Sequence, residues 1–113
     1  MVEPGRDACE RLLARTRPDA IFCANDLLAV GTLAAIRAAN LEVPGDVAVV
    51  GMDNTPLAEH TWPPLTTVDL GSAERARLAA ELLLKRIEQP GGRRRSIGVE
   101  PRLIVRASSR DAR

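Results

Sequence analysis

The sequence is poor in aromatic residues, cysteine and histidine, and each shortage excludes a class of protein or site. Among 113 residues the aromatic side chains are Phe22 and Trp62, and there is no tyrosine. A core must therefore be built from leucine, valine, isoleucine and alanine, and a hydrophobic content of 45% is enough for one. The two cysteines and single histidine form no ligand cluster, so we expect no metal site and no cofactor.

The few reactive side chains also argue against an enzyme. Cys9 and Cys23 are the only cysteines, and Cys23 lies inside an apolar run, which favours a buried, reduced thiol over a disulfide. His60 is the single histidine, and no residue near it in sequence suggests a nucleophile that it could activate. We therefore expect His60 in a solvated loop and no catalytic residues in the chain.

Long apolar runs and an excess of one charge are also missing. Sixteen basic and 15 acidic residues give a net charge of +1, which provides no global attraction to nucleic acid or anionic membranes. No apolar run approaches the ~20 residues that span a bilayer, and charges throughout residues 1–20 are unlike a signal peptide. These absences predict a cytoplasmic protein without a membrane partner.

The apolar residues that are present predict alternating helices and strands. Two apolar runs, at residues 20–24 and 47–52, do not alternate with polar residues. Both are therefore expected to be fully buried, parallel strands joined through a helix. A tail that begins at Ser108 is expected to be frayed. The predicted helices span residues 6–15, 26–40 and 72–88, and the predicted strands lie at 20–24, 47–52, 65–68 and 103–105.

Each of the two predicted parallel strands ends in a pair of polar residues. Asn25 and Asp26 follow the first strand, and Asp53 and Asn54 follow the second. In open α/β sheets the ligand binds at this carboxyl edge, where a carboxylate can accept hydrogen bonds from two vicinal hydroxyl groups. Asn25 and Asp53 therefore suit a sugar or nucleoside. Both pairs could instead cap turns and helices. Asp26 and Asn54 are possible ligand-binding or capping residues: the place of Asp26 favours a helix N-cap, and Asn54 could equally form a turn.

A series of short motifs in this sequence resembles that of a known protein family. The ordered series resembles the LacI/GalR family of bacterial transcriptional regulators from about Pro18 to Ser108, and its order and spacing make the resemblance specific. The motifs are Ala24-Asn25-Asp26, Val43-Pro44-Gly45-Asp46-Val47, Val50-Gly51-Met52-Asp53-Asn54, Pro63-Pro64-Leu65-Thr66-Thr67-Val68 and Arg102-Leu103-Ile104-Val105-Arg106-Ala107-Ser108.

The resemblance implies a parallel-sheet α/β fold of the periplasmic-binding-protein-like (type I) class, of which this chain is the C-terminal portion only. Residues 1–70 would belong mainly to the C-terminal subdomain of an effector domain. Residues 71–92 would be a helix of the N-terminal subdomain, and residues 93–113 a return segment and tail. The family's helix-turn-helix region and hinge are missing, so we expect no sequence-specific DNA binding by the chain itself.

By position, the resemblance also implies roles for individual residues. Asn25 and Asp53 match residues that contact the effector. Residues matching the family's homodimer interface are Val30, Leu33, Ala34, Thr61, Trp62 and Pro63, although the helix positions could instead pack within one chain.

Two positions depart from the family pattern. Leu70 stands where the family often has a polar residue that reaches the ligand, and Met52 stands where an aromatic residue is common. The Leu70 side chain cannot form a hydrogen bond, which leaves the class of ligand open.

The function expected from these observations is the effector-sensing and dimerisation part of a transcriptional regulator. A free-standing sugar-binding module is an alternative. A phosphoacceptor receiver-type domain is another, because Asp53 ends a strand as an acceptor aspartate would. The second alternative lacks an acidic pair after the first strand, and the only lysine, Lys85, lies in a predicted helix.

Overall fold

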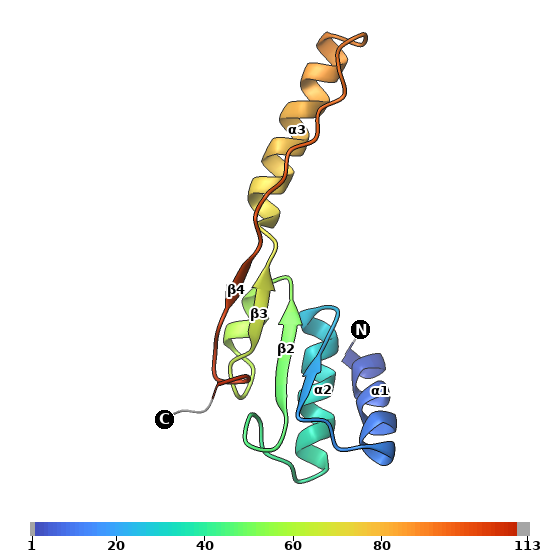
Figure 1. The fold of residues 1–113 in the computed structure, drawn as a ribbon, viewed down its shortest axis with the longest axis vertical. Coiled ribbons are helices and arrows are strands. Elements are labelled where there is room, and N and C mark those ends of the chain that lie inside the picture. Colours follow the sequence, from blue (N-terminus) through green and yellow to red (C-terminus); the bar gives the residue numbers. More distant parts are fainter. Residues whose placement is uncertain (1, 111–113) are drawn as a thin grey trace.

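The computed structural model describes residues 2–110, which form two parts (Figure 1). The lobe comprises residues 2–70 and 102–110, and the arm comprises residues 71–101. The long axis measures 59 Å and the Cα radius of gyration is 18.1 Å. A compact domain of 100 residues has a radius of gyration of about 13 Å. The difference arises because the arm projects away from the lobe.

A four-stranded sheet forms the centre of the lobe. Strands β1 (Ala20–Phe22), β2 (Ala48–Met52) and β3 (Thr66–Asp69) are parallel, and β4 (Arg102–Ile104) is antiparallel to β3, in the order β1-β2-β3-β4. Helix α2 (Asp26–Ala38) connects β1 to β2. The predicted βαβ unit is therefore confirmed.

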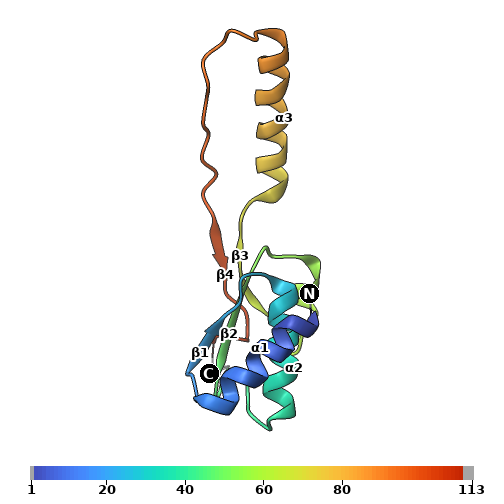
Figure 2. The same ribbon diagram turned by 90° about the vertical axis from the view of Figure 1, so that its right-hand side faces the viewer.

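Two helices cover one face of this sheet. Helix α2 lies against the sheet, and α1 (Val2–Arg15) packs beside α2 on the side away from β2 (Figures 1 and 2). The helices approach closely at Gly5 and Gly31, where an added Cβ atom would collide with the backbone of the other helix. The predicted start of α1 at residue 6 was wrong, because Pro4 is tolerated in the first turn of a helix, where its missing N–H is not needed.

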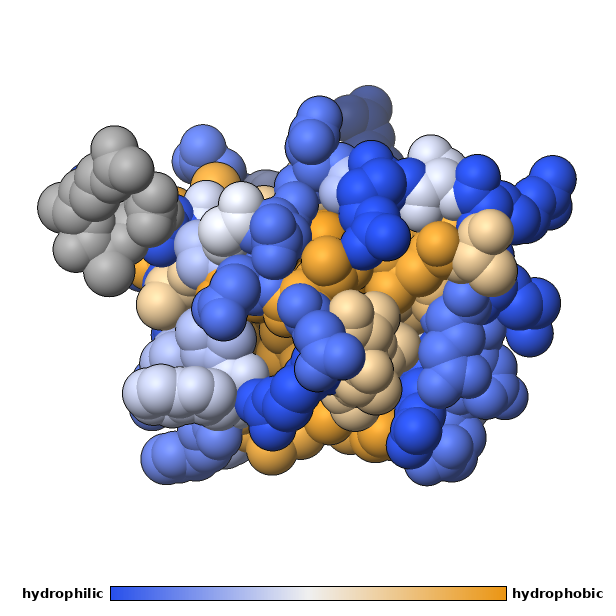
Figure 3. Space-filling view, turned by 90° about the horizontal axis from the view of Figure 1, so that it is seen from below, coloured by the Kyte–Doolittle hydropathy of each residue, from blue (hydrophilic) through white to orange (hydrophobic). Residues whose placement is uncertain are grey.

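The core lies between α2 and the sheet. Its largest fully buried apolar side chains are Ile36, Val47, Val49 and Leu65. Leu41 and Val43 pack against this core. The segment that joins α2 to β2 lies at the end of the lobe opposite the arm (Figure 1), and the view of that end shows apolar surface between hydrophilic residues (Figure 3).

Both cysteines are buried and free, which confirms the prediction for Cys23. Burial raises the pKa of the Cys9 and Cys23 thiols, so both favour the uncharged form.

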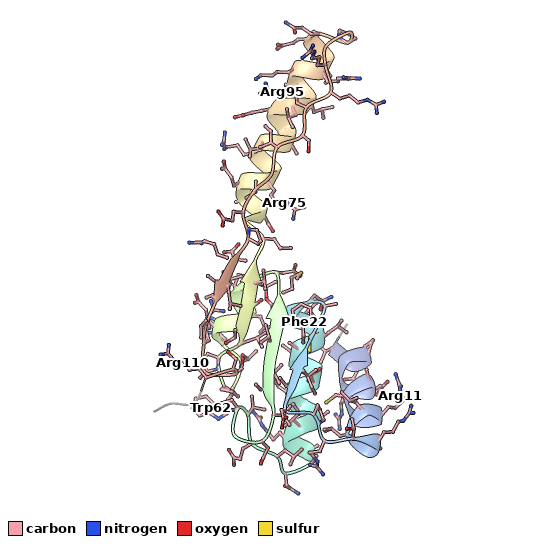
Figure 4. The ribbon with its side chains drawn as sticks, in the orientation of Figure 1. Arg11, Phe22, Trp62, Arg75, Arg95 and Arg110 are labelled. Atoms are coloured by element: carbon pink, nitrogen blue, oxygen red, sulfur yellow. The ribbon has the colours of Figure 1, made fainter. Side chains whose placement is uncertain are left out.

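The prediction of two fully buried strands was wrong for β1. Phe22 is 61% exposed and Ala20 is also exposed. Within residues 2–110, β1 is an edge strand and helices cover only one face of the sheet, so its remaining surface has no covering element. Figure 4 shows Phe22 at the surface of the lobe. The prediction was also wrong for β2, where burial alternates: Val49 and Gly51 are buried, and the other three residues are only partly buried.

The segment after β4 is ordered as far as the structure describes it. Ser108 is fully buried, donates from its hydroxyl group to the Val49 carbonyl at 2.6 Å and accepts from the Thr66 N–H at 2.8 Å. The expectation that the chain frays from Ser108 was therefore wrong, because this side chain joins two strands. Residues 111–113 lie outside the described part.

The arm consists of helix α3 (Ser72–Glu88) and an extended return segment that runs beside it (Figure 2). No residue of α3 is buried, and its apolar side chains Leu83, Leu84 and Ile87 are 59–65% exposed. The N-cap is Gly71, with a φ of 65° and no side-chain cap hydrogen bond. No helix in the described chain is long and apolar enough to cross a membrane.

Candidate functional site

The carboxyl ends of the three parallel strands form one edge of the sheet, on the side from which the arm rises (Figure 1). Phe22 of β1 pairs with Val50 of β2. Asn25 and Asp53 each lie three residues beyond this pair. The sequence-based expectation that these two residues share an edge therefore agrees with the observed register.

Asn25 is the N-cap of α2, and this corrects the prediction that Asp26 has that role. The Oδ1 atom of Asn25 accepts a hydrogen bond from the Leu28 N–H at 2.8 Å, and its backbone is extended, as an N-cap requires. Asn25 is half-buried, and its amide nitrogen donates no hydrogen bond within residues 2–110. The cap thus uses the oxygen of the side chain and leaves the nitrogen without a partner among the described residues.

Asp26, the first residue of α2, is fully buried. Its carboxylate connects α2 to two other segments, one that contains Thr55 and one that contains Thr67. Its Oδ2 atom accepts from the Thr55 N–H at 2.7 Å and the Thr55 hydroxyl at 3.0 Å, while Oδ1 accepts from the Thr67 hydroxyl at 2.6 Å. An added Cβ atom at Gly51 would lie 2.5 Å from Oδ1, so this position needs a glycine. Asp26 has no exposed surface to offer a ligand and instead holds the edge together.

Asp53 presents its carboxylate to solvent. The residue is exposed, and the side chain forms neither a hydrogen bond nor an ion pair within the described residues. Its N–H donates to the Val68 carbonyl at 2.9 Å, which fixes the backbone against β3. The φ angle is 113°, a value that few residues with a side chain adopt. Asp53 is therefore held by its backbone, and its two carboxylate oxygens remain available.

Asn54 follows with a φ of 50° and is held by its side chain. Its Oδ1 atom accepts from Arg106 Nη2 at 2.9 Å, and its Nδ2 atom donates to Asp69 Oδ2 at 3.0 Å. The Asn54 N–H donates to the Thr67 hydroxyl at 3.2 Å. Both ends of the side chain are thus used inside the protein, which favours the turn-forming role over ligand binding.

Asp69 ends β3 at the same edge, next to the start of the arm. Its Oδ1 atom accepts from the Gly71 N–H at 2.8 Å, and Arg102 Nη2 lies 3.7 Å from Oδ2. The Gly71 N–H, the Asn54 amide and, to a smaller extent, the Arg102 charge lower the pKa of Asp69. Leu70 is half-buried and adds no polar group to the edge.

The residues predicted for a homodimer interface fall into three groups by their exposure. Leu33 is only 6% exposed and packs in the core of this chain, so it has no surface for a partner. Ala34 is exposed, and Trp62 is 78% exposed (Figure 4). The remaining three residues are half-buried: Val30, Thr61 and Pro63.

One hydrogen bond connects the two surface segments that carry the predicted interface residues, α2 and the loop that contains Trp62. Arg37 Nη2, on α2, donates to the Trp62 carbonyl at 2.9 Å. The contact fixes the loop that carries Trp62 against α2.

Sequence reasoning missed the residues that support the edge from a distance. Thr55 and Thr67 bind Asp26 from 29 and 41 positions away, and Arg106 binds Asn54 across 52 positions. Nothing local in the sequence pairs these residues. Within residues 2–110 there is also no group of three or more histidine, cysteine, aspartate or glutamate side chains that could hold a metal ion.

A comparison with family models matches residues 2–109 to the periplasmic binding protein-like domain. Among curated proteins, the HTH-type transcriptional repressor PurR of Mannheimia succiniciproducens is 38% identical over 107 residues, which cover 94% of this chain and 32% of the repressor. The ribose operon repressor of Escherichia coli K12 is 41% identical over 106 residues, covering 93% of this chain and 32% of that protein. The chain thus spans about a third of the length of these relatives.

A solved structure shares the fold over nearly all of the chain. The complex of the transcriptional regulator CelR with cellobiose superposes with a TM-score of 0.92 at 37% identity, covering 96% of this chain and 34% of that one.

Proposed function

The chain belongs to the periplasmic-binding-protein-like family and is similar to the effector domains of LacI/GalR-type transcriptional regulators, and from this we propose that it is the C-terminal part of such a domain. The observation that carries the proposal is the geometry of Asn25 and Asp53. They follow adjacent parallel strands, and each keeps a polar group that no other residue within 2–110 uses. The same edge is where open α/β sheets bind ligands.

The ligand in this proposal is a small polyhydroxylated molecule. The Asp53 carboxylate accepts from two vicinal hydroxyl groups, and the Asn25 amide nitrogen donates to a hydroxyl or ring oxygen. The similarity to a cellobiose-bound regulator and to a ribose operon repressor supports a sugar, and a nucleoside would satisfy the same groups through its ribose. Leu70 contributes an apolar contact at most, so the specificity comes from other positions.

The division of the chain follows the same proposal. Residues 1–70 form most of the C-terminal subdomain, residues 71–92 contribute a helix to the N-terminal subdomain, and residues 93–113 are a return segment and tail. The absence of any buried residue in α3 supports this assignment, because an apolar stripe normally packs on a partner. In this arrangement the ligand edge faces the space between the two subdomains.

In this proposal the chain forms a homodimer, and each copy contacts the other through α2 and the loop that carries Trp62. Val30 and Ala34 on α2 and the exposed Trp62 ring supply the apolar contact. The Arg37–Trp62 hydrogen bond holds the two segments as one surface. Leu33 is left out because its side chain already packs in the core.

The whole protein in this proposal is a cytoplasmic regulator rather than an enzyme. One of the two relatives is named as an HTH-type transcriptional repressor and the other as a ribose operon repressor. DNA would be bound by a helix-turn-helix region outside this chain. Effector binding would change the DNA affinity only if the effector binds two arrangements of the subdomains with different affinities.

Thermal unfolding with D-ribose, cellobiose and adenosine tests the ligand assignment. A ligand at 100 times its Kd adds about 2.7 kcal/mol to the free energy of unfolding, so we expect one of these compounds to raise the Tm. Asp53→Asn removes the charge at the edge, and Asn25→Asp keeps the helix cap while removing the amide donor. Both should reduce the ligand-dependent shift while changing the Tm without ligand much less.

Asp19→Asn is the matched control, because Asp19 is an exposed aspartate at the opposite end of β1. Its ligand-dependent shift should equal that of the unmodified chain. A shift that survives in both Asp53→Asn and Asn25→Asp would refute the assignment of these residues. A melt that none of the three compounds moves would contradict ligand binding by this chain.

A further inference from the structure

The side chain of Asn54 lies between two charged residues from different parts of the chain. On one side, Arg106 Nη2 donates to its Oδ1 atom at 2.9 Å. On the other, its own Nδ2 atom donates to Asp69 Oδ2 at 3.0 Å. A side-chain amide provides an acceptor for an arginine and a donor for a carboxylate on one planar group, which a carboxylate or an ammonium group does not. This chemistry suits asparagine to position 54.

Arg106 is a fixed anchor rather than a mobile surface residue. Its side chain is 15% exposed, and its Nη1 atom donates to the Leu65 carbonyl at 2.9 Å. Its backbone N–H donates to the Thr66 hydroxyl at 2.8 Å, and Glu59 lies 3.6 Å from Nη2. The guanidinium group therefore holds Asn54 from a rigid position beside β3.

Asp69 connects Asn54 to the arm. Its second oxygen, Oδ1, accepts from the Gly71 N–H at 2.8 Å. Gly71 has a φ of 65° and is the N-cap of α3, so the direction of the helix is set at this residue. The Asn54 side chain is thus two hydrogen bonds away from the residue where the arm begins.

From these contacts we infer that Asn54 is a positioning residue that couples the presentation of Asp53 to the orientation of the arm. Asn54 and Asp53 are consecutive residues with positive φ, so the turn that presents the Asp53 carboxylate is fixed by the Asn54 side chain. The same side chain fixes Asp69, which fixes Gly71. A ligand that moves Asp53 would change the Asn54–Asp69 hydrogen bond and, through it, the start of α3.

Asn54→Asp tests the inference with little change to the fold. Aspartate tolerates a positive φ and still accepts from Arg106, but it cannot donate to Asp69. A second carboxylate would then lie beside Asp69, whose other close charged neighbour is Arg102. The pKa of Asp69 is lowered in the unmodified chain, and we expect it to rise in the variant, because Asp69 loses a donor and gains a like charge.

The Gly71 amide gives a readout that a purely structural role of Asn54 would not move. Its NMR chemical shift should titrate with Asp69, with a higher midpoint in Asn54→Asp. Residual dipolar couplings should show α3 aligned with the lobe in the unmodified chain and less ordered relative to the lobe in the variant. An unchanged midpoint together with unchanged couplings would overturn the inference.

Asn40→Asp is the control, because Asn40 also has a positive φ, of 59°, but lies at the end of α2. It should change neither the Gly71 titration nor the alignment of α3. The step from Asp53 to a ligand rests on the proposed function. The titration contains no ligand, so a failure of ligand binding would leave its result intact, and the two failures can be distinguished.

Discussion

Ile36 in the lobe and Leu84 in the arm are both large aliphatic residues on helices, yet Ile36 is fully buried and Leu84 is 59% exposed. Helix α2 packs against β2 and α1 and buries seven of its residues, whereas α3 buries none. Since most helical stability in proteins comes from packing an apolar face, the two helices must be stabilised differently.

The arm relies on local interactions. Arg77 lies 2.6 Å from carboxylate oxygens of both Glu74 and Glu81, one turn away on either side. All three side chains are at least half exposed, so solvent and salt weaken these ion pairs. The comparison shows that an apolar stripe predicts a helix, while the neighbouring elements decide whether the helix contributes to the stability of the fold.

The largest expected effect in this comparison comes from shortening one aliphatic side chain in each part. Ile36→Ala removes a fully buried side chain and should lower the free energy of unfolding by about 2–5 kcal/mol. Leu84→Ala removes an exposed one and should change it by no more than about 0.5 kcal/mol. Urea unfolding followed by circular dichroism measures both, and equal losses would show that the arm is packed in solution.

A smaller effect is expected from adding one methyl group to a glycine in each part. Gly31→Ala places a Cβ atom against the backbone carbonyl of Val2, so we expect a loss of about 1–3 kcal/mol as α1 and α2 separate. Gly98→Ala in the return segment meets no atom within 4 Å and should change stability by less than about 0.5 kcal/mol. The same unfolding assay decides, and an unaffected Gly31→Ala would mean that the helix pair can move apart freely.

The smallest effect concerns the ion pairs of the arm. Arg77→Gln removes the partner of both Glu74 and Glu81, so we expect a lower helical content in α3 and no change in the unfolding of the lobe. The Cα chemical shifts of residues 72–88 report this content. Because salt screens exposed ion pairs, the difference from the unmodified chain should shrink at 1 M NaCl. A shift in the lobe's unfolding midpoint would show that the ion pairs of the arm contribute to the stability of the lobe.

The order of the elements was predictable because it depends on local patterns. Apolar runs located β1 and β2, and the motif series indicated the family that the comparisons confirm. The exposure of Phe22 was not predictable from its neighbours in sequence, because burial depends on whether an element covers that face of the sheet. The same holds for α3, whose apolar stripe is present although none of its residues is buried within the described part of the chain.

The position of the candidate site was predictable from the sequence, but the role of each residue in it was not. Asn25 and Asp26 are both good N-caps, and the sequence favoured Asp26 for this role. The structure reverses it, because Thr55 and Thr67 satisfy Asp26 from distant segments and leave Asn25 to cap the helix. Choices of this kind depend on contacts across tens of residues, which no local pattern contains.

The slender attachment of α3 at Gly71 makes the arm a lever. Its 17 residues, at 1.5 Å each, reach about 25 Å from the attachment point, so a rotation of about 10° moves the far end by about 4 Å. A displacement of that size is enough to make or break a van der Waals contact with a neighbouring surface. A small rearrangement of the hydrogen bonds around Asp69 would therefore produce a larger displacement at the far end of α3. The size of that displacement would depend on the length of the helix rather than on the strength of any hydrogen bond.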